Sequence, residues 1–308
     1  MNKTLMAGLT ITLLILVAAL FGRYFAPYDI SEHVPPCYQV DENGQGTLIA
    51  PPYPPSAGNP FGTDRLGVDM MAKVLDGAKY TIIVSILIAA IRVVVGGVLG
   101  MLLGYVGKGN TAKADRLPIG KLLNGIPVFI IVWMMMRGIT INPMASPLKM
   151  TIMLSVVLAV VGIPAVTATV KEKTLVIREK QFILSAKSIG ASRWTIIRKH
   201  LFPHLQESFL ILFVQEIVLI LAVFGQLGLF NIFVGGTTLY PDRFDPVFVS
   251  RTNEWGGLIG QARSHLDIYQ WELFFPLLIY MVFILGFHMI SVGLEKLFKR
   301  RFSKYAQI

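Results

Sequence analysis

The chain has 308 residues, of which 54% are hydrophobic and only 15% are charged, and its formal net charge is +10. A mean hydropathy of +0.62 is too high for a soluble globular protein, so the composition excludes that class. The basic charge suggests nucleic acid as a partner, but its distribution along the chain argues against that class as well.

Six apolar runs follow one another, and most reach the ~20 residues that a helix needs to cross a bilayer. They cover about 5–22, 80–106, 122–136, 150–170, 208–234 and 273–292. The third run is short and begins with Asn124, Gly125 and Pro127, and we count it as a span because the charge topology requires it. The pattern predicts an all-α membrane protein with six spans. We expect an N-terminal anchor helix with an outer loop over 1–78 and a helical core over 79–308.

The charged residues predict the orientation of these spans. With both termini inside, the inner segments carry 18 Lys and Arg but five Asp and Glu, whereas the outer segments carry nine and twelve. Such a Lys and Arg bias is typical of the cytoplasmic side. A topology shifted by one span would place the basic segment 171–199 outside. The positive net charge of the chain is therefore explained by the orientation of its spans in the membrane, and we expect both termini to be cytoplasmic.

The first apolar run predicts a retained anchor. It is long for the apolar region of a signal peptide, and Leu20–Phe25 offers no small-x-small cleavage site. Cys37 is the sole cysteine, so an internal disulfide is impossible.

Two long outer loops, 23–79 and 235–270, separate the spans. The proline-rich stretch 35–55 favours an extended, polyproline-like backbone over regular helix or sheet. After it, Thr63 or Asp64 can cap a short helix on the outer membrane surface, tucked against the bundle or receiving a partner. This helix would present apolar residues at helical spacing: Leu66, Met70, Met71, Val74 and Leu75. The second loop is expected to pack over the outer mouth of the bundle.

Glycines mark the second span as a helix in the interior of the bundle. Gly96, Gly97, Gly100 and Gly104 lie at spacings that let helix backbones approach closely in lipid.

The inner segment 171–204 has the capping and terminating residues typical of two short helices. Over Glu179–Ile189 an apolar face is expected, formed by Phe182, Ile183, Ala186 and Ile189. Gly190 follows as the residue expected just past a helix end. Ser192 can then cap a second helix over Arg193–Phe202, which Pro203 is expected to end. Either this is an amphipathic connector on the membrane surface, or it presents a short helix to a cytoplasmic protein.

The segment resembles the E-A-A-x-x-x-G…L-P loop of ABC importer permeases, in the dipeptide, oligopeptide and nickel subgroup. The matching positions are Ser185, Ala186, Gly190, His200 and Pro203, with a similar lead-in over Val170–Leu175 and Phe182–Ile183. Leu184 stands where the motif has Glu, and Ser185 where it has its first Ala.

Further matches point to the C-type subunit of that family. Asn59–Asp69 resembles its H-P-L-G-T-D-x-x-G-R-D segment, with Val68 in place of the Arg. The segments Leu227–Phe230 and Trp255–Gly256 also fit, as do Pro127 and Pro276. At the C-terminal end Ser291–Glu295 departs from the family's G-D-x-L-R-like ending. The resemblance covers roughly residues 59–300.

The resemblance implies a type I ABC importer permease fold, with a cytoplasmic coupling helix and long extracytoplasmic loops. It implies a half-channel in a bacterial cytoplasmic membrane, working with a second homologous permease, two cytoplasmic ATPase subunits and an extracytoplasmic substrate-binding protein. The residues that couple to the ATPase would be Ser185, Ala186, Lys187, Gly190, Ala191, Ser192 and Pro203. Di- or oligopeptides are the expected cargo, with nickel or another small solute as the alternative.

The sequence agrees with ATP hydrolysis by a separate subunit. It has no G-x-x-x-x-G-K-[ST] phosphate loop, since the glycine-rich Gly104–Asn110 has another spacing and lacks the Lys-Ser/Thr end. We expect neither enzyme activity nor a bound cofactor or metal in this chain, and ATP with magnesium is assigned to the partner subunits. An ion-gradient-driven carrier is the rival class.

Arg92 and Glu216 are the clear charged residues within the apolar runs. Such groups are costly at membrane depth and mark a pathway or a pair. They are expected to form an ion pair inside the bundle or to line a watered translocation path.

Overall fold

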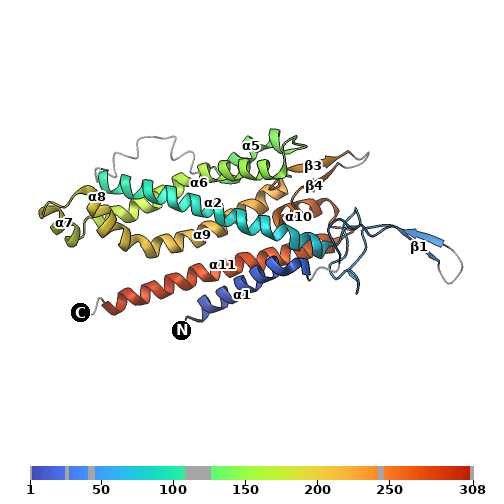
Figure 1. Ribbon diagram of the computed structural model, residues 1–308, viewed down its shortest axis with the longest axis horizontal. Coiled ribbons are helices and arrows are strands. Elements are labelled where there is room, and N and C mark those ends of the chain that lie inside the picture. The colour runs from blue at the N-terminus through green and yellow to red at the C-terminus, as the bar shows by residue number, and fades with distance from the viewer. Residues whose placement is uncertain (1, 25–27, 41–45, 108–125, 242–245, 306–308) are drawn as a thin grey trace.

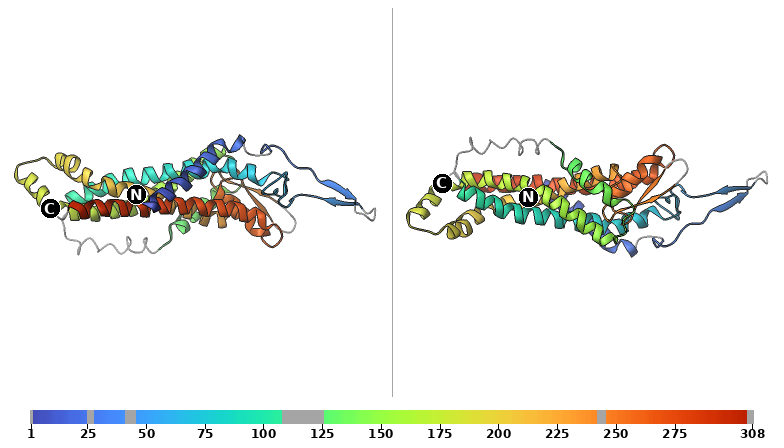
Figure 2. Two further views of the ribbon diagram at one scale, coloured as in Figure 1. Left: turned by 90° about the horizontal axis from the view of Figure 1, so that it is seen from below. Right: turned by 90° about the horizontal axis from the view of Figure 1, so that it is seen from above.

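The computed structural model of the protein describes residues 2–24, 28–40, 46–107, 126–241 and 246–305. Long helices run side by side and form an elongated bundle (Figure 1). Further views (Figure 2) agree that a thin two-stranded ribbon extends beyond one end of the bundle. The helical segment around residue 190 lies at the opposite end. We call these the ribbon end and the tip end.

Nine helices are described, together with short turns of other helical types. They are α1 (Lys3–Phe21), α2 (Met70–Val106), α5 (Val128–Thr140), α6 (Pro147–Arg178), α7 (Gln181–Ser188), α8 (Arg193–Ile196), α9 (Phe202–Leu229), α10 (Trp255–Ala262) and α11 (Gln270–Tyr305). A π-helical turn (η2, Ile197–Leu201) joins α8 to α9, and two 3₁₀ turns, η1 (Gly22–Tyr24) and η3 (Arg263–His265), follow α1 and α10. Two antiparallel hairpins complete the described part of the chain, β1 (Cys37–Val40) with β2 (Gly46–Ile49) and β3 (Thr237–Tyr240) with β4 (Val247–Ser250).

Five helical stretches of the described chain are long and apolar enough to cross a membrane: α1, α2, α6, α11, and the continuous stretch Arg193–Leu229 that comprises α8, η2 and α9. The short third apolar run forms α5, a helix of 13 residues, and residues 122–125 of that run lie outside the described residues. This agrees with the helical membrane fold expected from the apolar runs.

The glycines of α2 bring it into close contact with α6, which confirms that this span lies inside the bundle. A Cβ at Gly96, Gly100 or Gly104 would lie 2.9, 2.7 or 2.7 Å from the Cβ of Val166, Val170 or Thr174, respectively. Both helices therefore repeat their contact residues every four positions, so the two backbones approach along this part of their length.

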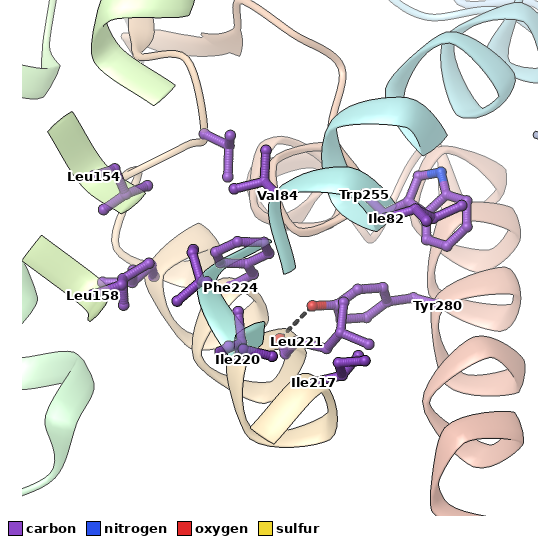
Figure 3. Close-up of a cluster of buried hydrophobic side chains, with 14 of the residues drawn as sticks. Ile82, Val84, Leu154, Leu158, Ile217, Ile220, Leu221, Phe224, Trp255 and Tyr280 are labelled. Carbon is purple, nitrogen blue, oxygen red and sulfur yellow. Dashed lines mark hydrogen bonds between the residues drawn. The ribbon is translucent and has the colours of Figure 1, made fainter. Parts of the chain in front are cut away.

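The main core lies where α2, α6, α9, α10 and α11 meet (Figure 3). Trp255 at the start of α10 is its anchor: its indole Nε1–H donates to Val74 O at 2.8 Å and its ring meets Phe283 edge-on at 5.4 Å. The Tyr280 hydroxyl of α11 donates to Leu221 O of α9. The segment 235–270 therefore packs into the bundle through α10, and its place over the outer mouth of the bundle stays a prediction.

At the ribbon end the expected surface helix is part of α2 instead. Helix α2 begins at Met70, and its cap is Asp69, whose Oδ2 accepts from Ala72 N–H at 2.8 Å, so Thr63 and Asp64 are not the cap. The prediction was wrong because the helical pattern of 66–75 runs without a break into the apolar span. The boundary expected between the N-terminal region 1–78 and the core 79–308 consequently falls inside this helix. That the chain has two such regions stays a prediction.

Asp64 has another role. Its carboxylate accepts from the N–H groups of Leu66 and Val68 at 2.9 and 2.8 Å, and it forms a buried ion pair with Lys73 of α2. The segment 59–69 is thus fixed to the start of α2. A further hydrogen bond, from Trp271 Nε1–H to Thr63 O at 3.2 Å, joins it to α11.

The proline-rich loop contains regular sheet, contrary to expectation. Strands β1 and β2 pair Tyr38 with Leu48, and the Tyr53 hydroxyl lies at the base of the ribbon, 2.9 Å from Ile49 O and 3.0 Å from Pro35 O. The prolines flank the strands rather than interrupting them, so they block no ladder hydrogen bond.

Candidate functional site

The tip end is built from helix α7 and the chain that follows it, and Gly190 sets its shape. Gly190 has φ +87°, in the left-handed region that glycine adopts without strain. Its N–H donates to Lys187 O at 3.0 Å, and the Ala191 N–H donates to Ala186 O at 3.1 Å. This pair of hydrogen bonds is the Schellman motif, so Gly190 ends the helix as its position predicted.

Ser192 starts the next helix, also as predicted, because its Oγ accepts from the Thr195 N–H at 3.2 Å. Pro203, however, does not end that helix. The turn before it widens to a π turn, in which Phe202 N–H donates to Ile197 O, and Pro203 lies in the first turn of α9. The expectation was wrong because a π turn accommodates the missing proline N–H within a continuing helix.

A small apolar core holds the tip together. We call it the tip cluster: Tyr105, Ile183, Ile196, Ile197 and Leu201. Ile183 of α7, Ile196 of α8 and Leu201 are fully buried, while Phe182, Ala186 and Ala191 pack at its edge. Tyr105 belongs to the end of α2, so the cluster joins the tip to a transmembrane helix.

The tip also carries apolar side chains that its own fold leaves uncovered. Ile189 is 87% exposed, Trp194 65% and Leu184 50%, and Ser185 and Ser188 are exposed as well. We call these five residues the tip surface. Ile189 was expected on one apolar face of the helix with Phe182, Ile183 and Ala186, but the helix ends at Ser188, and Ile189 is its exposed C-cap residue.

The other residues expected at this site have structural contacts. Lys187 lies with Nζ 5.2 Å from the centroid of the Tyr105 ring, a cation–π arrangement with the end of α2. Ala186 and Ala191 supply the backbone groups of the Schellman motif. The structure thus brings the predicted residues of α7 and its C-terminal turn together, with Pro203 two residues after Leu201 of the tip cluster.

Arg178 is a contact residue that the sequence did not reveal. It ends α6, and its Nη1 donates to the main-chain oxygens of Gly104, Tyr105 and Gly107 at 3.1, 3.3 and 2.5 Å. These carbonyls lie in and just after the last turn of α2, where helical partners are missing and the helix dipole is negative. A lone Arg in a basic segment gives no signal of this contact, because its acceptors are backbone groups.

Arg92 and Glu216 face each other in the middle of the bundle. Arg92 Nη1 lies 2.9 Å from Glu216 Oε2, and the side chains are 4% and 9% exposed. Arg92 also donates from Nε and Nη2 to Leu158 O of α6, at 3.1 and 2.7 Å. Gly162 leaves the room for the guanidinium, since a Cβ there would lie 2.1 Å from Arg92 Cζ. One side chain therefore ties α2 to both α6 and α9.

A second buried carboxylate, Glu254, holds the second outer loop in place. Its side chain accepts from the N–H groups of Gly256 at 2.8 Å and Val234 at 3.4 Å. Burial raises the pKa of Glu254 to about 7, although these backbone donors oppose the shift. Sequence reasoning singled out the neighbouring Trp255 and Gly256 but missed Glu254, because a carboxylate in a polar loop looks like a solvated charge.

Within the residues that the structure describes, no group of three or more His, Cys, Asp and Glu side chains is arranged to hold a metal ion. The candidate site described above comprises the tip surface, the tip cluster and their contacts with the bundle.

The fold is that of a multi-pass membrane protein in which a small structured tip, with an uncovered apolar surface, is connected to long membrane helices. Residues 96–304 match the family described as the inner membrane component of binding-protein-dependent transport systems, and the chain belongs to that family. Residues 1–59 match the N-terminal transmembrane domain of oligopeptide transport permease C.

Curated relatives cover nearly the whole chain. The chain is 27% identical to the glutathione transport system permease protein GsiD of Pectobacterium atrosepticum, over 94% of this chain and 84% of the relative. It is 27% identical to the dipeptide transport system permease protein DppC of Bacillus subtilis (96% and 81%), and 24% identical to that organism's oligopeptide permease protein OppC (96% and 84%). The resemblance inferred from the motifs is thereby confirmed.

Proposed function

We propose that this chain is the C-type permease subunit of an ATP-driven importer for di- or oligopeptides in a bacterial cytoplasmic membrane. It forms half of the translocation path together with a second homologous permease. Two cytoplasmic ATPase subunits supply the energy, and an extracytoplasmic binding protein delivers the cargo. The named relatives carry peptides or glutathione, which favours peptides over nickel.

The tip surface is the observation that carries this proposal. Monomeric proteins leave single apolar side chains exposed, but the short segment 184–194 exposes a Leu, an Ile and a Trp around a capped turn, which is typical of a surface that a partner covers. The fully buried Ile183 and the Schellman motif fix the turn in one shape. A rigid surface of this kind can both bind an ATPase and transmit its movement.

The ion pair of Arg92 and Glu216 supports a structural role rather than a watered path. Both side chains are more than nine-tenths buried. We assign to this pair the task of keeping α2, α6 and α9 together while the bundle moves.

The test is purification of the native chain from its source membrane in mild detergent, followed by uptake measurements after reconstitution. We expect an ATPase, a second permease and a binding protein to copurify, and peptide uptake to require ATP. Uptake by this chain without partners, driven by an ion gradient and insensitive to ATP depletion, would instead support the carrier class.

A further inference from the structure

We propose that Arg178 makes the end of α2 part of the moving tip, so that ATPase movement is passed to α2 and α6 together. This inference rests on the proposed function, since it assumes that an ATPase moves the tip. It assigns a positioning role to a residue outside the motif by which the tip resembles its family.

The position of Arg178 is the first support. It is the last residue of α6, and three residues further on α7 begins with Gln181. Its guanidinium reaches sideways to the last turn of α2, where Gly107 O lies 2.5 Å from Nη1. A pull on α7 is therefore applied to a residue that is hydrogen-bonded to α2.

The second support is a parallel connection through Tyr105. Its ring packs in the tip cluster with Ile183 of α7, and Lys187 lies over it. Arg178 holds the backbone of α2 while α7 holds a side chain of the same turn. Two contacts of different chemistry thus resist separation of α2 from the tip.

The third support is the close packing of α2 on α6 just above these contacts. At Gly104 an added Cβ would lie 2.7 Å from Thr174 Cβ and 2.9 Å from Lys171 O, so neither helix can shift freely past the other. With its 37 residues, α2 extends about 55 Å from the tip to the ribbon end. A displacement of its inner end is therefore carried toward the segment that Lys73 and Asp64 fix at the far end.

Arginine suits this role better than lysine. Its planar guanidinium offers several N–H donors in a fixed fork and keeps its charge, whereas the lysine ammonium is a single flexible point charge. We expect Arg178→Lys to retain part of the function and Arg178→Gln to lose it.

The experiment uses the full complex of both permeases, the ATPases and the binding protein, reconstituted in lipid nanodiscs for ATPase assays and in liposomes for uptake. Arg178→Gln is compared with Lys199→Gln, which removes an exposed charge from the nearby π turn. For Arg178→Gln we expect unchanged ATPase copurification and basal hydrolysis. In the Arg178→Gln complex, the loaded binding protein should stimulate ATP hydrolysis at least about fivefold less than in the native complex, and the rate of uptake should fall by a similar factor. The Arg178→Lys complex should have intermediate values of both quantities. Lys199→Gln should match the native complex.

Loss of ATPase copurification in Arg178→Gln would assign Arg178 to assembly and overturn the proposed role. Stimulation and uptake at the native level in this variant would overturn it as well.

A second measurement does not depend on the stability of that variant. Spin labels at Val106→Cys and Gln181→Cys, in a chain with Cys37→Ser, report the distance between α2 and α7. We expect one distance that is the same without nucleotide and in the ATP-trapped state. A distance that changes between these states would contradict the proposal, whereas absence of any ATPase from the native preparation would contradict the proposed function itself.

Discussion

Arg92 of α2 and Glu216 of α9 form an ion pair in the middle of the bundle, with Nη1 and Oε2 2.9 Å apart. Because Arg92 also donates twice to Leu158 O, the pair connects three helices that are distant in sequence. A buried charge whose partner is removed is strongly destabilising, by about 3–5 kcal/mol, whereas replacing both partners by apolar groups is often tolerated.

We therefore expect Glu216→Gln to lower the thermal stability of the purified protein severely, and the double variant Arg92→Met with Glu216→Met to recover most of it. The matched control is the exposed ion pair of Lys79 with Asp76. Its removal in Lys79→Gln should cost less than about 1 kcal/mol. Equal effects of Glu216→Gln and Lys79→Gln would show that the buried pair does not hold the helices together.

Gly190 provides a test of the shape of the tip. Nothing lies within 4 Å of a Cβ added there, so a substitution acts through the backbone at φ +87° and not through a clash. A β-branched residue in this region costs about 1–2 kcal/mol and favours another turn. We expect Gly190→Val to abolish uptake with membrane insertion intact, and Gly190→Asn to keep most uptake, because Asn tolerates the left-handed region. Native uptake in Gly190→Val would rule out a requirement for this turn.

The packing of α2 on α6 can be tested with two Gly→Ala substitutions. At Gly100 the new Cβ would meet Val170 Cβ at 2.7 Å and Thr167 O at 2.8 Å, whereas at Gly138 of α5 nothing lies within 4 Å. Gly100→Ala should therefore lower the thermal midpoint, despite the better helix propensity of alanine. Gly138→Ala should leave it unchanged or raise it slightly, since alanine gains up to about 1 kcal/mol in a helix. A similar response at both positions would contradict close packing at Gly100.

The raised pKa of the Glu254 carboxyl predicts that the stability of the folded protein depends on pH. Its pKa is raised by burial from 4.5 to about 7, so ionisation is costly in the folded protein only. Below pH 4.5 the carboxyl is protonated in both states and the cost is absent, and above pH 7 the full cost is present. Stability should thus fall as the pH rises from 4.5 to 7.

The measurement compares thermal unfolding of the native chain and Glu254→Gln between pH 4.5 and 8. Other titrating groups affect both proteins alike, so the difference between the two curves isolates Glu254. We expect the native chain to lose stability relative to the variant across this interval. A constant difference would mean that Glu254 is ionised without cost in the fold.

Local sequence signals predicted the tip well and its connections poorly. Gly190 and Ser192 were identifiable because helix ends are set by the conformational freedom of one residue and the hydrogen-bonding side chain of another. Pro203 was misread because a π turn, which depends on packing around Ile197 and Leu201, has no simple residue pattern. The apolar runs likewise predicted the long helices but could not show that α2 begins at Met70, outside its apolar part.

Contacts to backbone groups were the least predictable. Arg178 binds carbonyls of a helix some seventy residues earlier, and Glu254 binds N–H groups of its own loop. Among the residues that the structure describes, neither forms an ion pair whose position in the sequence could reveal the contact. The pair of Arg92 and Glu216 was anticipated as one of two alternatives, because a charge in an apolar run demands compensation.

Site-specific photo-crosslinking in the assembled complex tests most directly whether the tip binds the ATPase. A photoreactive amino acid is placed at Ile189 on the tip surface and, as the control, at Leu48, which is 70% exposed on the ribbon at the other end of the molecule. We expect Ile189 to yield an adduct with an ATPase subunit and Leu48 to yield none. An ATPase adduct at Leu48, with none at Ile189, would contradict both the docking role of the tip and the orientation of the chain.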